Sequence, residues 1–313
     1  MKKLLLILLC LPMIGFGQLT MIPDANFEQE LIDLGYDVAP VNGSVYTALI
    51  NTMTFLNVSN SNISDLTGIE DFTALAYLDC SNNQLTSLDV SSNTVLTELK
   101  CVTNQLTILD VSQNTALTSL NCGNNQLTSI DVSGATALID LYCGANQLTS
   151  LDVSQNTSLV YLICEQNQLS SLDVSGCTAL SFLRVSENQL TILDVSTNTA
   201  LTYLYCLYNQ LINLDLRNGN NININYVSLS ENPNLFCINV DDDSYSNVNW
   251  INIDPQSYFS NNCSGTTNIE EHTTNKELLK VTDLLGREKK GTKNETLLYL
   301  YDDGTVEKRI VIE

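Results

Sequence analysis

A period of 21 residues governs the sequence between residues 78 and 216. Cysteine recurs at multiples of this interval, with Val185 in the one place where it is missing: Cys80, Cys101, Cys122, Cys143, Cys164 and Cys206. Asparagine keeps the same step at Asn83, Asn104, Asn125, Asn146, Asn167, Asn188 and Asn209. A fixed period of this length is typical of a solenoid, in which each repeat buries apolar side chains against its neighbours. We therefore expect stacked coils rather than a globular domain with one central core.

Each unit approximates the pattern L-x-x-L-x-C-x-x-N-Q-L-T-x-L-D-V-S-x-N-T-x. In the first unit, Leu78 and Cys80 alternate with polar residues, as in a strand that is buried on one face, and Leu88 to Val90 alternate again. The asparagine column is placed so that its amides can hydrogen-bond the backbone of neighbouring coils. No stretch of a unit is long and periodic enough for an ordinary helix.

This pattern resembles the leucine-rich repeat family, whose L-x-x-L-x-L-x-x-N-x-L core it matches with Cys in place of the third Leu. The resemblance covers seven tandem copies. It implies a curved solenoid with little helix and a parallel β-sheet on its concave side. An irregular first repeat places Leu56 and Val58 at 22 residues before Leu78 and Cys80, and after the last regular unit the period slips to 23. We expect the repeats to occupy residues 53–240.

The chain begins with the features of a secretory signal peptide over residues 1–17. Lysines follow Met1, an apolar run comes next, and a small residue, Gly17, ends the segment. The apolar run is too short to span a bilayer. Since no other segment is apolar enough, we expect no membrane insertion after the signal is removed, and a location outside the cell or on the outer-membrane surface.

Residues 18–52 depart from the repeat and are expected to form an N-terminal cap, because the open ends of a solenoid must be shielded. Asp24 is a suitable N-cap residue for a short helix. Phe27, Leu31 and Leu34 would share one face of that helix and cover the first coil.

The other end of the array is expected to close in a similar way. Residues 236–240 are predicted to form a last edge strand, and residues 241–264, which include Trp250, a C-terminal cap. Cys237 and Cys263 flank this cap. In an exported protein a disulfide between them is the natural interpretation.

Residues 265–313 differ in composition from the rest of the chain, because eight of the 13 Lys and Arg residues lie between Lys276 and Arg309. Residues 279–288 and 303–313 resemble the C-terminal sorting domain of the type IX secretion system. The resemblance implies a small β-sandwich-like tail that engages this machinery and directs passage across the outer membrane. A generic β-rich tail is the alternative.

Charge excludes two classes of partner. Residues 18–275 hold three basic side chains, namely Lys100, Arg184 and Arg217, against 27 acidic ones. Nucleic acids require cations that neutralise phosphates, so this surface would repel them. Anionic lipid surfaces are excluded for the same reason.

The sequence offers little for catalysis. Its one histidine, His272, lies in the linker before the tail, which argues against nucleophilic sites that need a histidine base. There is no Cys-x-x-Cys pair, phosphate-binding glycine loop or His-rich metal motif. We therefore predict no catalytic residue, no metal site and no cofactor.

Two periodic columns carry chemistry but have structural interpretations. The aspartates are expected to accept N–H groups of the turns that follow them, with a row of calcium ions as the alternative: Asp89, Asp110, Asp131, Asp152, Asp173, Asp194 and Asp215. The cysteine column is expected to consist of free thiols packed as small apolar side chains in the core. Cys177 lies in a turn without an obvious partner.

One feature is not periodic, and it is where function is expected. The residues on either side of the strand leucine point out of the concave sheet, and from the fourth unit onward they become aromatic. We predict that this patch binds a protein or glycan through Tyr142, Tyr161, Phe182, Arg184, Tyr203, Tyr205 and Tyr208.

Three other interpretations stay open for the same face. The tyrosines could serve only to stiffen the sheet by cross-strand packing. A carbohydrate-active enzyme could use two concave acids such as Asp140 and Glu187. The whole array could also be a structural spacer.

The resemblance of the tail generates the first testable prediction. Deleting residues 270–313 should trap the protein in the periplasm, because the sorting signal would be lost. Cell fractionation followed by immunoblotting measures this. Truncated protein found at the cell surface or in the medium would contradict the assignment.

Overall fold

The computed structural model describes residues 17–263, 278–282, 296–301 and 306–310. The chain separates into two compact units, Met1–Cys263 and Ser264–Glu313, and each is described by itself. The predicted signal peptide lies outside the described residues except for Gly17.

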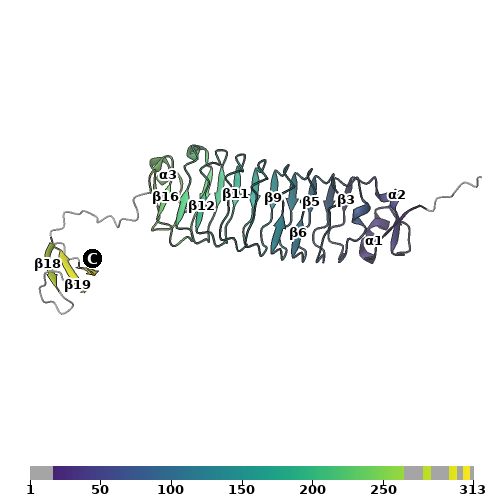
Figure 1. The fold of residues 1–313 in the computed structure, drawn as a ribbon, viewed down its shortest axis with the longest axis horizontal. Coiled ribbons are helices and arrows are strands. Elements are labelled where there is room, and N and C mark those ends of the chain that lie inside the picture. The colour runs from purple at the N-terminus through teal and green to yellow at the C-terminus, as the bar shows by residue number, and fades with distance from the viewer. Residues whose placement is uncertain (1–16, 264–277, 283–295, 302–305, 311–313) are drawn as a thin grey trace, which may run out of the picture. The chain divides into compact units, whose positions relative to one another are not determined.

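The first unit is a solenoid whose coils follow one another in a row (Figure 1). One side of the row is a parallel sheet of nine strands, called the long sheet below. Neighbouring strands pair at steps of one repeat, so that Leu78 lies beside Leu99 and Leu99 beside Leu120. In spatial order the strands are β3 (Phe55–Asn57), β4 (Tyr77–Asp79), β5 (Glu98–Lys100), β7 (Ser119–Asn121), β9 (Asp140–Tyr142), β10 (Tyr161–Ile163), β11 (Phe182–Arg184), β13 (Tyr203–Tyr205) and β15 (Tyr226–Ser228). The predicted solenoid of 21-residue coils with a parallel sheet is confirmed.

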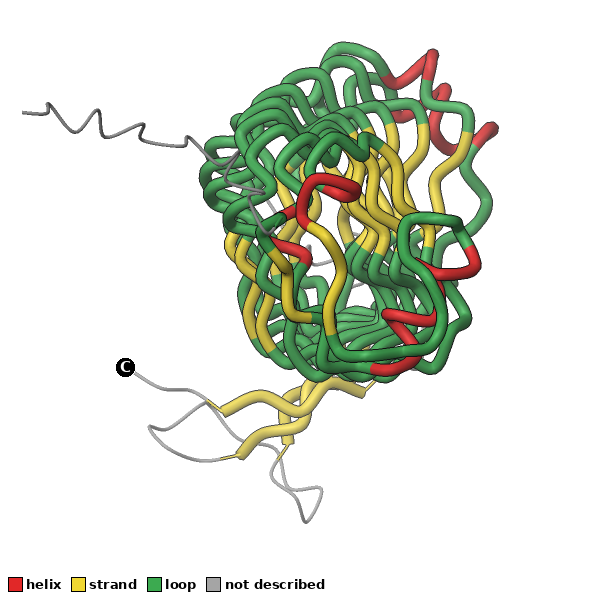
Figure 2. Tube along the Cα trace, turned by 90° about the vertical axis from the view of Figure 1, so that its right-hand side faces the viewer, coloured by secondary structure: helices red, strands yellow, loops and turns green. Residues whose placement is uncertain are grey.

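A second set of short strands runs along another side of the coils, as the view along the stack shows (Figure 2). Four of these strands come from the Leu-Asp or Ile-Asp part of regular repeats, where the sequence also predicts alternation, and the other two lie after the last regular repeat. They are β6 (Ile108–Asp110) paired with β8 (Ser129–Asp131), and a four-stranded sheet of β12 (Ile192–Asp194), β14 (Asn213–Asp215), β16 (Cys237–Asn239) and β17 (Tyr258–Ser260). Turns and two short 3-10 helices, Ile69–Asp71 and Asn221–Asn223, join the two sides.

The core between these sides is filled by the periodic leucines and cysteines. Leu78, Cys80 and Leu85 are fully buried, as are their equivalents in later coils. The predicted column of free core thiols is confirmed, because Cys80, Cys101, Cys122, Cys143, Cys164, Cys177 and Cys206 are all unbridged and buried. Burial raises the pKa of the Cys143 and Cys206 thiols to about 12, so these groups stay protonated and unreactive at neutral pH.

The asparagine column ties each coil to the one before it, as predicted. Asn125 shows the pattern: its Nδ2 donates to the carbonyls of Cys101 and Cys122 at 2.9 and 3.1 Å, and its Oδ1 accepts the N–H of Leu106 at 3.0 Å. Asn104 also donates to the Cys101 carbonyl, at 3.2 Å. Each such carbonyl is therefore shared by the amides of two successive coils.

A second asparagine column, which is not predicted from the sequence, lies in the Ser-x-Asn-Thr turns. Asn114 is fully buried, and its Nδ2 donates to the carbonyls of Val90 and Asn93 in the preceding coil at 2.9 and 3.0 Å. Asn93, Asn156 and Asn198 make equivalent bonds. Neighbouring coils are thus joined by buried asparagine hydrogen bonds at two places, one next to the long sheet and one in the Ser-x-Asn-Thr turns. Each of these contacts is called a clamp below.

Two coils lack the second clamp, and each carries a glycine beside the substitution. Ala135 follows Gly134, and Cys177 follows Gly176. A Cβ atom at Gly134 would lie 1.7 Å from the carbonyl oxygen of Ser112, so this coil approaches its neighbour too closely for any side chain. The Cys177 thiol only partly replaces the amide, with sulfur contacts of 3.7 Å to two carbonyls of the preceding coil.

The aspartate column does what the simpler interpretation expects. In seven repeats the Asp Oδ1 accepts the backbone N–H of the residue two positions later, at 2.8–3.0 Å. The hydroxyl and N–H of Ser91 hold the pKa of Asp89 below its ordinary value. Among the described residues no group of three or more His, Cys, Asp or Glu side chains is placed to hold a metal ion.

The N-terminal end of the stack is covered by α1 (Ala25–Asp33), α2 (Thr47–Ile50) and a hairpin-like pair of β1 (Leu19–Met21) and β2 (Ser44–Tyr46). The Asp24 carboxylate caps α1 by accepting the N–H groups of Asn26 and Phe27 at 2.9 and 3.1 Å. Phe27 and Leu31 are fully buried, but Leu34 is the C-cap residue and is 46% exposed. The buried face of the helix is therefore shorter than the sequence predicts.

At the other end, α3 (Asp243–Asn249) and β17 cover the last coil. The sequence predicts residues 236–240 as the edge strand, which is wrong because β17 pairs beyond β16 in parallel register. Trp250 and Phe259 are buried, with ring centroids 5.5 Å apart. Cys237 and Cys263 are joined by a disulfide, with their Cα atoms 5.7 Å apart.

The second unit contains a three-stranded antiparallel sheet in the order β18 (Leu278–Thr282), β19 (Thr296–Tyr301) and β20 (Val306–Ile310). Much of the predicted sorting tail lies outside the described residues, so its assignment to the type IX secretion system stays a prediction.

The asparagine column gives a stability prediction. Replacing Asn125 with Ala leaves the buried N–H of Leu106 without its partner and removes one of the two donors from the Cys101 and Cys122 carbonyls. We expect the free energy of unfolding to fall by about 2–4 kcal/mol, measured by urea denaturation. Gln126→Ala is the control. The Gln126 side-chain amide is next to Asn125 in the sequence but is exposed, and it makes no described side-chain hydrogen bond. Equal losses in the two variants would contradict a clamping role.

The disulfide gives a third prediction. Closing a loop with a sequence separation of 26 residues should stabilise the cap by about 3 kcal/mol in the chain-entropy view. Mass spectrometry of the non-reduced, digested protein should find the peptides of Cys237 and Cys263 linked. Recovery of both cysteines as alkylated free thiols would show that the bond does not form.

Candidate functional site

The candidate site lies on the outer face of the long sheet. Each strand contributes three residues, of which the central apolar one is buried while the first and third face outward. The outward residues of the first coils are mostly polar, and from β9 to β15 they are mostly aromatic. We call the following set the aromatic strip: Tyr142, Tyr161, Phe182, Arg184, Tyr203, Tyr205 and Tyr226.

Phe182 is the centre of the aromatic strip. Its ring centroid lies 5.9 Å from that of Tyr161, 5.7 Å from that of Tyr203 and 5.5 Å from that of Tyr205. Tyr205 continues the contacts to Tyr226 at 4.9 Å. The rings are tilted against one another, an arrangement worth about 0.5–1.5 kcal/mol a pair beyond area burial. This packing fixes the orientation of the rings before any partner arrives.

The strip nevertheless keeps surface for a partner. Tyr161 is 42% exposed and Tyr226 37%, while the other rings are half-buried. No hydroxyl of its five tyrosines has a hydrogen-bond partner among the described residues, so these groups remain free to bind. The strip thus combines rigid apolar faces with unused polar tips.

Arg184 is held in place within the strip. Its guanidinium lies 5.6 Å from the ring centroid of Tyr205 and forms an ion pair with Glu165 in the turn after β10. Stacking on a ring and pairing with a carboxylate suit the planar guanidinium and reduce the freedom of a long side chain.

Tyr208, which the sequence groups with these residues, lies in the turn after β13. Its backbone has a φ of 55°, and its side chain is 52% exposed without a described ring contact. The equivalent turn residue of every regular coil has a similar positive φ. The backbone conformation at Tyr208 is therefore a general feature of the solenoid and does not depend on the tyrosine side chain. Tyr226 is not in the set predicted from the sequence, although it lies beside Tyr203 in the same column.

A shallow hollow of about 220 Å³ adjoins the strip at the ends of β7, β9 and β10. It exists because Gly123 and Gly144 carry no side chains where the next coil has Glu165. Tyr142 and Ile163 form part of its wall, and Asn121, Asn124, Glu165 and Gln166 supply polar groups. The hollow offers room for a side chain of a partner beside the rings.

A smaller cluster, not predicted as a site, lies at the other end of the same face. The rings of Phe55 and Tyr77 are stacked with centroids 4.4 Å apart, and Lys100 Nζ lies 5.1 Å from the centroid of Tyr77. Lys100 also pairs with Glu98 at 2.8 Å. Both clusters therefore place a cation over a ring, although polar residues separate them.

The two acids that an enzymatic interpretation would use are not paired. Asp140 begins β9, whereas Glu187 lies in the turn after β11 and accepts hydrogen bonds from Gln166 at 3.1 and 3.2 Å. The strand β10 lies between β9 and β11, and no described hydrogen bond or ion pair joins the two carboxylates. Burial, and then the charge of Glu98, raise the pKa of Asp140.

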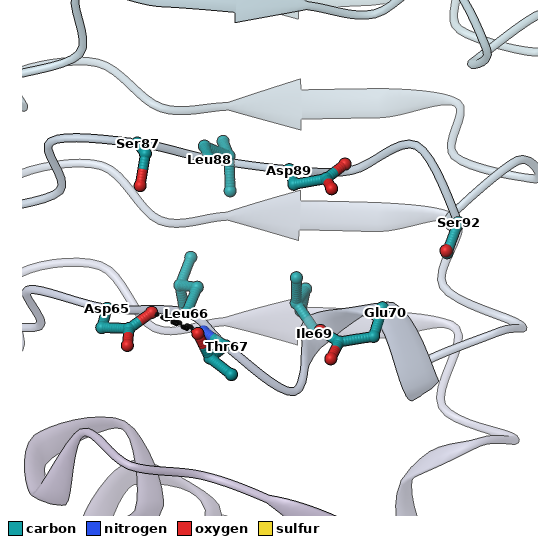
Figure 3. A pocket seen from close by; sticks show the side chains of 9 residues that line it. All are labelled: Asp65, Leu66, Thr67, Ile69, Glu70, Ser87, Leu88, Asp89 and Ser92. Carbon is teal, nitrogen blue, oxygen red and sulfur yellow. Dashed lines mark hydrogen bonds between the residues drawn. The ribbon is translucent and has the colours of Figure 1, made fainter.

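Another pocket, of about 410 Å³, lies where the irregular first coil meets the first regular one (Figure 3). Asp65, Glu70 and Asp89 lie around it, and the Asp65 carboxylate is occupied by the N–H and hydroxyl of Thr67 at 2.8 and 2.7 Å. No basic side chain lines this pocket.

No known protein-family profile matches the sequence. A stretch of 72 residues, 23% of this chain, is 38% identical to Internalin J of Listeria monocytogenes, and the match spans only 8% of that protein. The solved functional domain of InlJ is 29% identical over 72% of this chain and 68% of its own length, with a TM-score of 0.36. Internalin C2 of the same species is 25% identical over 70% of this chain and 94% of its own, with a TM-score of 0.51.

These likenesses support a bacterial leucine-rich repeat protein, and the fold is that of a leucine-rich repeat solenoid. In the described part of the chain, no helix is long and apolar enough to cross a membrane.

Proposed function

We propose that the protein is a non-enzymatic recognition or adhesion protein that binds a protein or glycan through the aromatic strip. The observation that carries this proposal is the cluster of tilted, half-exposed rings with free hydroxyl groups around Phe182. Tyrosine and arginine are the side chains that most often dominate binding interfaces, because they combine contact area with directed hydrogen bonds. The likeness to internalins agrees with a protein-interaction role.

The setting of this function is also a proposal. The signal-like first residues, the disulfide of the C-terminal cap and the resemblance of the tail to type IX sorting domains support a protein that is secreted or held at the cell surface.

The competing structural interpretation has an observation in its favour, because the rings contact one another across four strands of the long sheet. In that case the strip would stabilise the stack and contact no partner. Binding and stability must therefore be measured together.

Replacing Tyr161, Tyr203 and Tyr205 with Ala should abolish most binding while the solenoid stays folded. Truncation of central interface residues commonly costs about 2 kcal/mol or more of binding free energy, which is about a thirtyfold loss of affinity. The lost ring contacts should lower the free energy of unfolding by about 1–3 kcal/mol, or a few degrees of Tm. Arrays of purified extracellular proteins and of glycans first identify ligands of the wild-type protein, and titrations then compare the variants.

The matched control replaces three exposed isoleucines on the other side of the coils, Ile108, Ile192 and Ile212, with Ala. This control should bind like the wild type. A triple tyrosine variant that keeps its affinity but loses much of its Tm would show that the rings are scaffold. Release of new sugar ends from a bound polysaccharide would instead indicate an enzyme.

A further inference from the structure

Asp140 lies beside the first ring of the aromatic cluster, and its carboxylate has no partner among the residues that the structure describes. It is paired in register with Ser119 on one side and with Tyr161 on the other. The side chain is half-buried, and in the described part of the chain it makes no hydrogen bond or ion pair. Other acids of this face are satisfied: Glu98 by Lys100, Glu165 by Arg184, and Asp79 by the N–H of Ser81.

The body of the protein has no spare cation for this carboxylate. Between residues 18 and 275 the only basic side chains are Lys100, Arg184 and Arg217. Each of them is already paired with another acid, the third with Asp215. The nearby charge of Glu98 adds repulsion, which contributes to the raised pKa of Asp140. A cation brought by a partner would relieve this repulsion.

The rings beside Asp140 are suited to the same kind of partner. The face already places Arg184 over Tyr205 and Lys100 over Tyr77, at 5.6 and 5.1 Å from the ring centroids. Tyr161, the neighbour of Asp140, leaves 42% of its surface open. An exposed tyrosine ring attracts a lysine or arginine side chain through its negative face.

We propose that the strip binds a cationic polypeptide segment, one lysine or arginine of which pairs with Asp140 while the adjoining residues lie over the rings. This inference rests on the proposed function and names the class of its partner. With three basic against 27 acidic side chains, the body of the protein attracts positively charged partners over a long range and repels anionic glycans.

The dimensions of the strip agree with a peptide. From β9 to β15 the face crosses four strand intervals, or about 19 Å at the usual spacing. An extended peptide covers that distance with about six residues. The hollow beside Tyr142 offers room for a further side chain of the peptide.

The test uses the full-length mature protein and a synthetic peptide of about eight residues in which Gly and Arg alternate. A peptide with Gln in place of Arg is the neutral comparison. Calorimetric titration should show binding of the arginine peptide and at least tenfold weaker binding of the glutamine peptide. Asp140→Asn should lower the affinity for the arginine peptide by about threefold to tenfold, because the substitution removes the negative charge and keeps the shape of the side chain.

Asp152→Asn is the matched control, because it removes one equally negative charge from the aspartate column on another side of the coil. It should change the affinity by less than about twofold. Since Asp140 has no partner among the described residues and its charge is repelled by Glu98, Asp140→Asn should not lower the Tm of the protein. The variant with Tyr161, Tyr203 and Tyr205 replaced by Ala should also lose binding of the arginine peptide.

Four results would overturn this inference. They are the absence of binding to the arginine peptide, equal affinity for both peptides, equal effects of Asp140→Asn and Asp152→Asn, and unchanged peptide binding by the triple tyrosine variant. A ligand from the arrays that needs the tyrosines but tolerates Asp140→Asn would leave the proposed function standing and reject the cationic partner.

Discussion

The backbone carbonyl at each cysteine position accepts hydrogen bonds from two successive asparagine amides, and the rest of the structure depends on this shared contact. Asn104 and Asn125 meet in this way at Cys101. Because the amide of one coil reaches the backbone of the previous coil, a shift of one residue would leave buried polar groups unpaired. The register of the stack is therefore strict. Rings that are distant in the sequence, such as those of Tyr161 and Tyr226, consequently come to lie on one continuous face.

Much of this fold could be predicted because every coil must bury the same apolar side chains and pair the same backbone groups. The buried leucines, the free thiols and the clamping role of Asn125 follow from period and polarity alone. The second column, exemplified by Asn114, was not foreseen, because a Ser-x-Asn-Thr stretch also satisfies the ordinary rules for an exposed turn. Only the coil geometry shows that this amide points inward to the carbonyls of the preceding coil. The edge strand was missed because β17 follows a non-repeating segment.

The candidate site was predictable as a column but not as a set of contacts. Strand alternation places Tyr161 and Phe182 on the outer face, whereas the central position of Phe182 depends on how four side chains tilt together. The lack of a partner for Asp140 is equally invisible in the sequence. It requires knowing that the nearby cations are occupied, and Arg184 pairs with Glu165 through a turn rather than along its own strand.

The substitution of Cys177 for the inward asparagine has a mechanical consequence. At that junction the coils keep the hydrogen bonds of Asn167 near the long sheet. They lose most of the second asparagine contact, because the Cys177 thiol makes only contacts of 3.7 Å. On the outer face, the same junction lies between β9 and β10, where Tyr161 pairs in register with Asp140 and Ile163 with Tyr142. A stack that is held tightly on one side and loosely on the other bends more easily there than at a junction that keeps both asparagine contacts. This junction lies beneath the aromatic strip, between the strands of Tyr142 and Tyr161, so a bend there changes the curvature of the strip while each coil stays intact.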